Sequence, residues 1–271
     1  QVLSSLTLGD APYAYKELVD YFSVNTFFVS ANVRNMIQEG YGDYTPISFS
    51  DIPALFASGE MPIDVALIQV TPPDTQGRCS LGVSVDIVKS AAANAGLVIA
   101  QVNPQMPWTL GDSFVSVLDL DILVPGDEPL IETSYAGFID DIKAGTWASD
   151  SWTIAQAIGE HIASLVEDGS TIEVGIGRIP HAVVSLLKDK KDLGIHSEMI
   201  SDGVMNLVEQ GVITGRKKTL HPGKIVITFA MGSQNFYEWL DNNQNMLMYP
   251  VDYVNDPYVI GQIDNMLSIN S

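Results

Sequence analysis

Cysteine is nearly absent from this sequence, whose 271 residues include only Cys79. A single cysteine cannot form an internal disulfide, and no metal-finger spacing is present, so we expect a reducing, cytoplasmic environment. Long hydrophobic runs are also missing. No stretch approaches ~18 uninterrupted apolar residues, which excludes a membrane-spanning helix. No basic segment leads into an apolar run at the start, so no signal peptide is predicted.

Basic residues are scarce as well. Lys and Arg number 13 against 33 Asp and Glu, which gives a net charge of -20. Such a surface repels a phosphate backbone, so nucleic acid is excluded as a partner. The apolar share of 46% and the charged share of 17% exclude a disordered tail and a coiled coil. A packed globular protein remains, long enough for one large domain or two modest ones.

Residues 126–151 are acidic, rich in turn residues and weakly periodic. This composition is typical of a connection on the surface. We therefore expect a first domain over residues 1–125, a linker over residues 126–151 and a second domain over residues 152–271. The second half carries less of the negative charge, which makes it the more hospitable half for an anion.

Short β-rich runs alternate with amphipathic runs in both halves. The alternation predicts an α/β fold with parallel sheets, because parallel strands need crossover helices. The predicted strands span 25–30, 63–71, 96–102, 121–124, 171–175, 194–196, 224–229 and 246–251. We expect those of the first half to be buried. The predicted helices span 83–95, 153–168 and 179–188.

Gly175 and Gly177 lie in a turn between a predicted strand and a predicted helix, with Pro180 at an early helical position. Backbone N–H groups at such a helix start can face an anionic or polar ligand. Pro180 occupies the third glycine position of the dinucleotide-binding motif, so a Rossmann site is excluded. A tight turn without a ligand is the alternative.

Glu198 lies in an apolar, strand-like stretch just before a Ser-Asp-Gly turn. A carboxylate at the carboxyl end of a strand in an open α/β sheet points into the crevice where ligands bind. Partial desolvation would make it a better nucleophile or base than a solvated glutamate. The alternative is a structural glutamate that caps the following helix or pairs with His196.

Asn103 and Gln105 follow another predicted strand. Their amides can donate to a carbonyl or carboxylate without adding charge, or they can satisfy loop backbone groups. The Pro- and Gly-rich segment 71–82 is either the rim of a cleft or an ordinary connection. Cys79 within it is either a small buried filler or a reactive thiol.

Two basic clusters, residues 188–191 and 216–218, either attract a phosphate-bearing ligand or form solvated helix ends. The four histidines lack the spacing of a metal pair, and no Ser/His/Asp order stands out. We therefore predict no metal site and no serine-hydrolase chemistry.

Longer motifs run along nearly the whole chain: TPPDTQGRCSLGVSVD, VIAQVNPQMPWTLGDS, IGEHIASLVEDG, VGIGRIPHAV, LGIHSEMISDGV, KKTLHPGKIV and MYPVDYVNDP. Together, and in this order, they resemble the acetyl-CoA hydrolase/transferase family, most closely its 4-hydroxybutyrate or butyryl-CoA:acetate CoA-transferase branch. The resemblance implies two CoA-transferase-like α/β domains, each incomplete here. It also implies that a glutamate of the second domain, Glu198 by its motif, attacks the acyl-CoA thioester.

The implied reaction cycle runs through an acyl-glutamyl anhydride and a glutamyl-CoA thioester. It needs no metal or organic cofactor, since coenzyme A is itself a substrate. The remaining site residues come from the same resemblance: Gly175, Gly177, Gly232 and Asn255 against CoA, and Asn103 with Gln105 beside the acyl group.

Two features depart from the family pattern. Members are considerably longer, so we expect a fragment or processed product that lacks the front of the first domain and the back of the second. In the family, the missing C-terminal part holds a Gly-rich loop that helps to form the oxyanion and CoA site. Arg178 and His181 stand where the family has a small residue and an Asp or Asn, which alters the geometry of the CoA turn.

The resulting hypothesis is a cytoplasmic CoA-transferase that moves CoA between a short-chain acyl-CoA (butyryl-, 4-hydroxybutyryl- or acetyl-CoA) and a carboxylic acid such as acetate. A hydrolase that admits water to the same glutamyl intermediate is one alternative, and a truncated, non-catalytic CoA-binding module is another. A sugar-phosphate isomerase of similar architecture would need a base and a phosphate clamp that we do not find. Truncated domains expose core-like surface, which leaves a homo-oligomer open as well.

Overall fold

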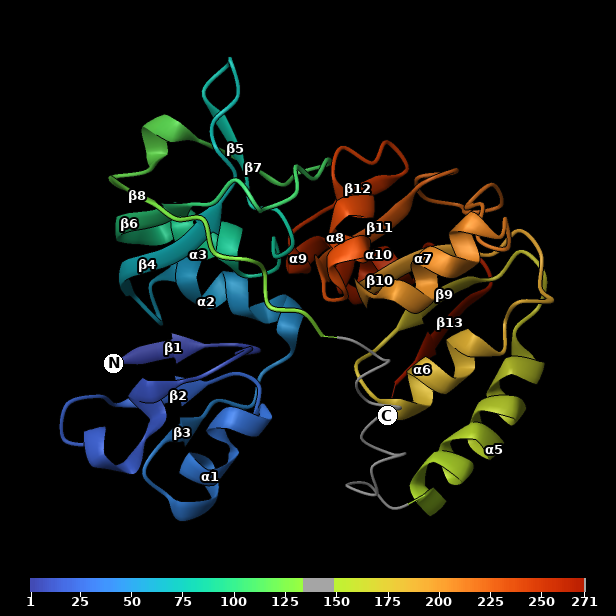
Figure 1. Cartoon of the computed structure of the whole chain (residues 1–271), viewed down its shortest axis with the longest axis horizontal. Helices are drawn as coiled ribbons and strands as arrows, with labels where there is room; N and C mark the ends of the chain where they lie inside the picture. The colour runs from blue at the N-terminus through green and yellow to red at the C-terminus, as the bar shows by residue number, and fades with distance from the viewer. Residues whose placement is uncertain (134–148, 271) are drawn as a thin grey trace. The chain divides into compact units, whose positions relative to one another are not determined.

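Parallel pairing joins the strands of all three larger sheets in the computed structural model, which describes residues 1–133 and 149–270 (Figure 1). The predicted α/β class is confirmed. The chain divides into two units, Gln1–Ile52 and Pro53–Ser271.

The first unit holds a small parallel sheet in the order β1-β2-β3, formed by Val2–Ser4, Val24–Thr26 and Asp43–Tyr44. Helix α1, Ala31–Glu39, buries Val33 and Met36 and ends at Gly40. Gly40 has a φ of 77°, the left-handed conformation that favours glycine after a helix. Short 3₁₀ turns lie at Pro12–Ala14, Lys16–Leu18 and Phe49–Asp51.

The second unit begins with a three-stranded parallel sheet in the order β4-β6-β8. Its strands are Ile63–Val70, Ala95–Val102 and Ile122–Pro125. An antiparallel pair, β5 (Arg78–Ser80) and β7 (Phe114–Ser116), lies in the same unit, with a 3₁₀ turn at Val117–Asp119. The helices of this part are α2 (Ile52–Ser58) and α3 (Val88–Asn94).

Two predictions for this part are wrong in detail. The strands are not all buried as predicted, since all four residues of β8 are exposed and Asp64, Val65 and Leu67 of β4 are exposed too. The reason is that β8 is an edge strand, paired only with β6. The helix predicted over 83–95 starts only at Val88, because the segment before it pairs with a distant strand: Val85 and Asp86 both donate their N–H groups to the carbonyl of Thr228.

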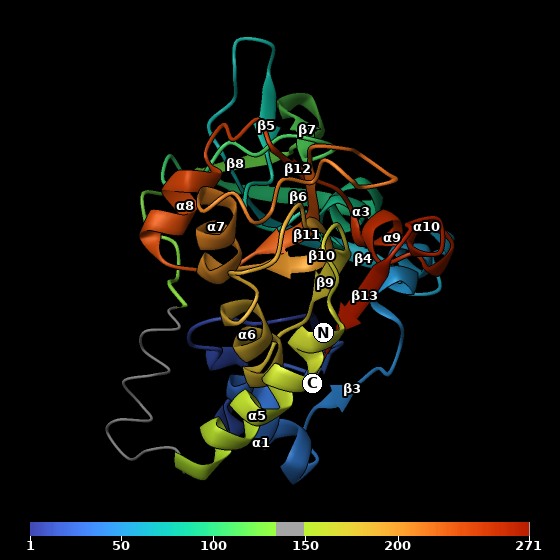
Figure 2. The same ribbon diagram turned by 90° about the vertical axis from the view of Figure 1, so that its right-hand side faces the viewer.

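A five-stranded parallel sheet in the order β12-β11-β10-β9-β13 forms the rest of the second unit. Its strands in chain order are β9 (Thr171–Val174), β10 (Gly194–Ile200), β11 (Ile225–Ala230), β12 (Met246–Met248) and β13 (Met266–Ile269). The helices are α5 (Ser149–Leu165), α6 (Arg178–Ser185), α7 (Asp202–Glu209), α8 (Gln234–Leu240), α9 (Val251–Val254) and α10 (Pro257–Ile260). Figure 2 shows α7 and α8 on one side of this sheet and α9 and α10 on the other.

The strand predicted at 194–196 is longer than expected, because β10 pairs with β11 as far as Ile200. Glu198 is therefore inside a strand, as predicted from its apolar, strand-like surroundings. Strand β13, which sequence analysis missed, adds an outer strand beside β9. Both sheets of the second unit contribute to one apolar core, in which Val70, Leu187, Ile195 and Ile227 are fully buried.

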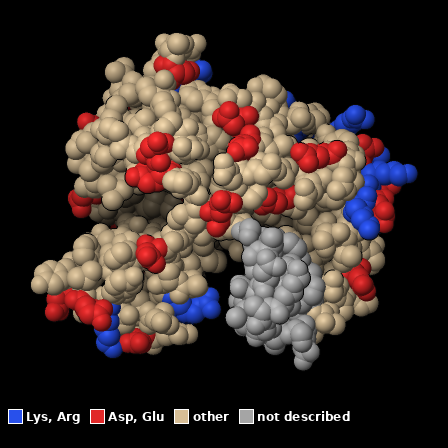
Figure 3. All heavy atoms as spheres, in the orientation of Figure 1, with Lys and Arg blue, Asp and Glu red and all other residues tan. Residues whose placement is uncertain are grey.

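The predicted linker over 126–151 falls largely outside the described residues, and the domain boundary there stays a prediction. Within the described ranges, no helix is long and apolar enough to cross a membrane. Figure 3 shows acidic side chains spread over the visible face, with Lys and Arg in fewer places, as the net charge of -20 requires.

Candidate functional site

Strand β10 presents alternate residues to the two sides of its sheet. Ser197 faces β9, where its hydroxyl contacts the backbone of Val174, and Met199 faces the side of α6 and α7. His196 and Glu198 face the other side, where α9 packs on the strand. Because the strand ends at Ile200, Glu198 lies near the carboxyl edge of the sheet, where ligands bind in open α/β folds.

The Glu198 carboxylate accepts a hydrogen bond from Asn255. Asn255 follows α9 directly, and its Nδ2 lies 2.8 Å from Oε2 of Glu198. The two residues are distant in sequence, so only the packing of α9 on β10 brings them together. The other amide atom, Oδ1 of Asn255, is buried and has no hydrogen-bond partner among the described residues.

Glu198 neither pairs with His196 nor caps the following helix. His196 places its Nε2 2.9 Å from the carbonyl of Val254 instead of pairing with the carboxylate. The following helix, α7, has Ser201 at its N-cap and no side-chain cap.

Burial dominates the electrostatics of Glu198. Its side chain is largely removed from water, which raises the pKa of the carboxyl group, and the nearby carboxylates of Glu173 and Asp86 raise the pKa further. The hydrogen bond from Asn255 opposes both effects by favouring the charged form. The result is a poorly hydrated carboxylate with one firm donor, a good starting state for nucleophilic attack.

His196 holds α9 in place below this pair. The ring is almost fully buried, and burial lowers the pKa of His196 to about 4, so the imidazole is neutral near neutral pH. A neutral ring that donates from Nε2 to the Val254 carbonyl leaves Nδ1 as an acceptor, and Nδ1 is buried without a hydrogen-bond partner in the described part of the chain. Since Val254 immediately precedes Asn255, this bond fixes the donor of Glu198.

Lys218 corrects one sequence prediction. The cluster 216–218 was expected at a solvated helix end or near a phosphate, yet Lys218 is buried beneath β10. Its Nζ donates to the carbonyls of Ile195 at 2.6 Å and Lys224 at 2.8 Å. Burial lowers the pKa of Lys218 to about 7.

We expect Lys218→Met to remove a pH-dependent part of the stability. The unfolded chain binds the Lys218 proton more tightly than the folded protein does, because the folded pKa of about 7 is below the ordinary lysine pKa of 10.5. The native protein therefore gains stability relative to the variant as pH rises from about 7 toward 10, by roughly 3–4 kcal/mol. Urea unfolding of both proteins across this range measures the difference, and a gap that does not vary with pH would contradict the expectation.

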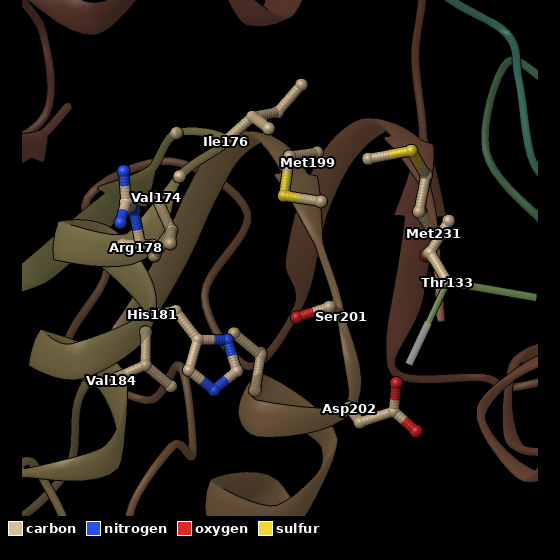
Figure 4. A pocket seen from close by; sticks show the side chains of 13 residues that line it. Thr133, Val174, Ile176, Arg178, His181, Val184, Met199, Ser201, Asp202 and Met231 are labelled. Carbon is tan, nitrogen blue, oxygen red and sulfur yellow. The ribbon is translucent and has the colours of Figure 1, made fainter. Parts of the chain in front are cut away.

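Gly175 and Gly177 border a cavity of about 420 Å³ at the carboxyl edge of the sheet. Figure 4 shows His181 of α6 and Asp202 of α7 at this cavity, together with Met199 and Met231 from the ends of β10 and β11. Glu198 is not among the lining residues, since its neighbour Met199 points to the cavity and Glu198 to the other face. The cavity and the carboxylate thus lie at one edge of the sheet, on different faces.

The geometry of the turn explains its glycines. Gly177 has a φ of 142°, which a side chain would strain, and it is the N-cap of α6. A Cβ on Gly175 would meet the side chain of Asn270, which follows β13, so a larger residue there would have to displace that side chain. His181 lies in the cavity wall, where burial lowers its pKa to about 4 and Asp202 opposes the shift.

The remaining predicted residues lie elsewhere. Gly232 follows β11, donates its N–H to the hydroxyl of Tyr237 at 3.2 Å and accepts from the N–H of Thr133 at 3.0 Å. Asn103 is fully buried and bonds to the backbone of Glu128 and Gln105. The Gln105 amide donates to Asp127 at 2.9 Å. Asn103 and Gln105 therefore form hydrogen bonds with loop residues and do not contact Glu198. Their place at an acyl pocket stays a prediction.

Other candidates have structural explanations. Cys79 is fully buried, and burial raises the pKa of its thiol, which fits a packing role. In the segment 71–82, Asp74 pairs with Arg78 at 2.7 Å across a turn. In the described ranges, no group of three His, Cys, Asp or Glu side chains is arranged to hold a metal ion.

Sequence reasoning missed Asp86 and Thr228 near this site. Asp86 is buried before α3, where Ser84 and the N–H of Ile87 donate to its carboxylate, and burial raises its pKa. Thr228 lies on β11 beside β10. The two-residue spacing from His196 to Glu198 indicates that both share a face, but no sequence signal linked either one to Asp86 or Thr228.

Comparison with known proteins identifies relatives along the whole chain. Residues 1–132 match the acetyl-CoA hydrolase/transferase N-terminal domain, and residues 232–271 match the C-terminal domain of that name. A 4-hydroxybutyrate coenzyme A transferase of Clostridium kluyveri is 49% identical over 100% of this chain and 60% of its own length. A succinyl-CoA:acetate/propanoyl-CoA:succinate CoA transferase of Fasciola hepatica is 43% identical over 97% of this chain and 52% of its own length.

A solved structure similar to this chain is also named as a CoA-transferase. The crystal structure of a 4-hydroxybutyrate CoA-transferase from Porphyromonas gingivalis has a TM-score of 0.77 and 36% identity, and the match covers 98% of this chain and 67% of that one. The chain spans about half to three-fifths of the length of the curated relatives it matches, 52% and 60% for the two above.

Proposed function

The chain belongs to the acetyl-CoA hydrolase/transferase family, and we propose from this premise that the protein moves CoA between a short-chain acyl-CoA and a carboxylic acid, with Glu198 as the nucleophile. The observation that carries the proposal is the hydrogen bond from Asn255 to a largely buried Glu198 carboxylate at the carboxyl edge of the sheet. Both residues were predicted from the sequence, from motifs far apart in the chain.

The proposed reaction conserves the energy of the thioester. An oxygen of Glu198 attacks the thioester carbon, the C–S bond breaks, and CoA leaves as a thiolate from an acyl-glutamyl anhydride. The thiolate then attacks the Glu198 carboxyl carbon, which releases the acyl group as a free carboxylate and leaves a glutamyl-CoA thioester. The acceptor carboxylate reverses both steps, so that CoA ends on the acceptor and the Glu198 carboxylate is restored.

Asn255 has two roles in this scheme. In the resting state it orients the Glu198 carboxylate through Oε2. When a tetrahedral centre forms at the Glu198 carboxyl carbon, the same N–H faces the oxygen that gains negative charge. The buried Oδ1 of Asn255 lacks a partner among the described residues and is suited to accept an N–H group from the bound thioester substrate.

The other site assignments also come from the family resemblance, and we make them as proposals. Gly175 and Gly177 would lie against CoA, for which the adjoining cavity of about 420 Å³ gives room at the helix start. Gly232 has protein partners on both backbone groups, which makes it the weaker candidate. The reaction needs no metal and no organic cofactor, since CoA is a substrate. We also propose a cytoplasmic location, because a chain with a single cysteine forms no internal disulfide. The protein is either a monomer or a homo-oligomer.

Acyl-CoA hydrolysis is the second candidate. The Glu198 side chain is largely but not fully buried, and its remaining exposure lets water reach the carboxyl group. A glutamyl thioester reached by water would be hydrolysed instead of passed to an acceptor. The two functions share every step up to this intermediate.

Exchange and hydrolysis are separated by one experiment on the full-length protein. Butyryl-CoA is supplied with and without labelled acetate, and acetyl-CoA and free CoA are quantified. We expect label to enter acetyl-CoA in proportion to acetate, with little free CoA. Release of free CoA without exchange would reject the transferase in favour of the hydrolase.

Trapping the intermediate tests the non-catalytic alternative. Borohydride or hydroxylamine added after butyryl-CoA should modify Glu198, detected by peptide mass spectrometry. If the protein binds butyryl-CoA and yields no adduct at Glu198, it is a binding module and the proposed mechanism is wrong.

A further inference from the structure

Thr228 lies directly beside Glu198 across the sheet. The β10–β11 register pairs Ser197 with Ile227 and Met199 with Phe229, so Thr228 stands opposite Glu198. Residues paired in this way on parallel strands direct their side chains to the same face, and neighbouring strands are ~4.8 Å apart. On the other flank, continuing the register of β9 places Gly175, which has no side chain, beside Glu198. Thr228 is therefore the cross-strand side chain nearest to the carboxylate in the register.

The hydroxyl of Thr228 is buried and unused. Thr228 is fully buried, and its Oγ1 has no hydrogen-bond partner in the described part of the chain. Its backbone is firmly held, because the carbonyl accepts from the N–H groups of Val85 at 3.0 Å and Asp86 at 3.2 Å. A buried hydroxyl without a partner lowers stability and calls for an explanation.

Packing alone does not account for the hydroxyl. Valine has the same shape as threonine, is favoured equally in strands and would avoid the desolvation cost. Every other residue of β11 is apolar, from Ile225 to Ala230. The single polar side chain of the strand is thus the one opposite the nucleophile.

We propose that the Thr228 hydroxyl is the second side-chain donor to the Glu198 carboxyl group, bonding Oε1 while Asn255 holds Oε2. The bond forms by rotation of the Glu198 side chain toward β11. The kinetic effects expected from this bond rest on the proposed function. The proposed bond itself does not require substrate, so it can be tested without turnover.

The second donor has a defined use in the reaction. When the CoA thiolate attacks the Glu198 carboxyl carbon of the anhydride, the bond to the acyl oxygen breaks and negative charge passes through the remaining glutamyl oxygen. Two donors fixed on two sides of the carboxyl group stabilise that charge whichever oxygen carries it. Because Thr228 is on a central strand and Asn255 follows a helix packed on the sheet, both donors are preorganised.

Thr228→Val and Thr228→Ser form a matched pair for the test. In the full-length protein, Thr228→Val should lower the rate of glutamyl-CoA formation and kcat about 10- to 100-fold, with KM for butyryl-CoA within about twofold, because one hydrogen bond to a charged group is lost. Thr228→Ser keeps the hydroxyl and should stay within about threefold of the native rate. The melting temperature of Thr228→Val should be unchanged or higher, which separates the loss from misfolding.

A titration of the Glu198 side chain by carbon-13 NMR gives a readout independent of activity. Thr228→Val should move the Glu198 titration to higher pH, since a donor to the charged form is removed, and Thr228→Ser should not. The other titratable groups that face Glu198 are Glu173 on β9, Asp86 before α3 and His196 on β10, and all are retained in both variants.

Three outcomes decide whether Thr228 is a donor to Glu198. A shifted titration and slower turnover in Thr228→Val alone support the second donor. Native behaviour of Thr228→Val, or equal losses in Thr228→Ser, overturns it. If the native protein itself transfers no CoA, the proposed function fails, and the titration by itself decides whether Thr228 bonds to Glu198.

Discussion

Glu198→Gln should abolish CoA transfer, with a fall in kcat of at least ~1000-fold, because the amide cannot form the acyl-glutamyl anhydride. The substitution preserves the shape of the side chain and its contact with Asn255, so the fold should be retained. The measurement is acetate-dependent exchange from butyryl-CoA, together with borohydride trapping. Glu209→Gln, at the exposed end of α7, is the matched control and should retain native activity.

A pH profile adds a second signature for Glu198. Burial, followed by the carboxylates of Glu173 and Asp86, raises the pKa of Glu198 above its ordinary value, with Asn255 in opposition. Only the ionised carboxylate attacks, so the rate of glutamyl-CoA formation should rise with pH through this raised pKa and level off above it. A full rate maintained down to the ordinary titration range of an exposed glutamate would show that Glu198 is not desolvated during reaction.

Asn255→Ala should cost about 100- to 1000-fold in kcat, the effect of losing one donor aimed at developing charge. The loss should be in kcat more than in KM, because the bond is to the nucleophile rather than to a remote part of CoA. Asn255→Asp, which has the same shape, should be at least as harmful near neutral pH. Its carboxylate beside Glu198 raises the pKa of the pair and moves the acid limb of the profile upward.

Asn206→Ala is the control for Asn255, since Asn206 is exposed on α7 and makes no contact with Glu198. Circular dichroism and thermal unfolding check that each variant is folded. Equal, modest losses in the two alanine variants would contradict a special role for Asn255. Native activity in Asn255→Asp would show that its Nδ2 contact is not used in turnover.

Local sequence determined the fold class and most strands of this protein. The β-rich runs at 63–71, 96–102 and 171–175 became β4, β6 and β9, since a short apolar run bounded by turn residues has few other stable solutions. The apolar run around Glu198 likewise predicted a carboxylate near the carboxyl end of a strand, while the proposed roles of Glu198 and Asn255 came from the family resemblance of their motifs. These are local signals, carried by residues next to one another.

Only the tertiary structure decided which side chains meet. Whether Glu198 would cap a helix, pair with His196 or contact Asn255 depended on strand pairing out to Ile200 and on the docking of α9, neither of which a short window contains. Burial of Lys218 and the position of Thr228 opposite Glu198 follow from the same long-range register. Strand alternation assigns a face to each residue, but the neighbour across that face comes from a distant segment, and packing alone selects it.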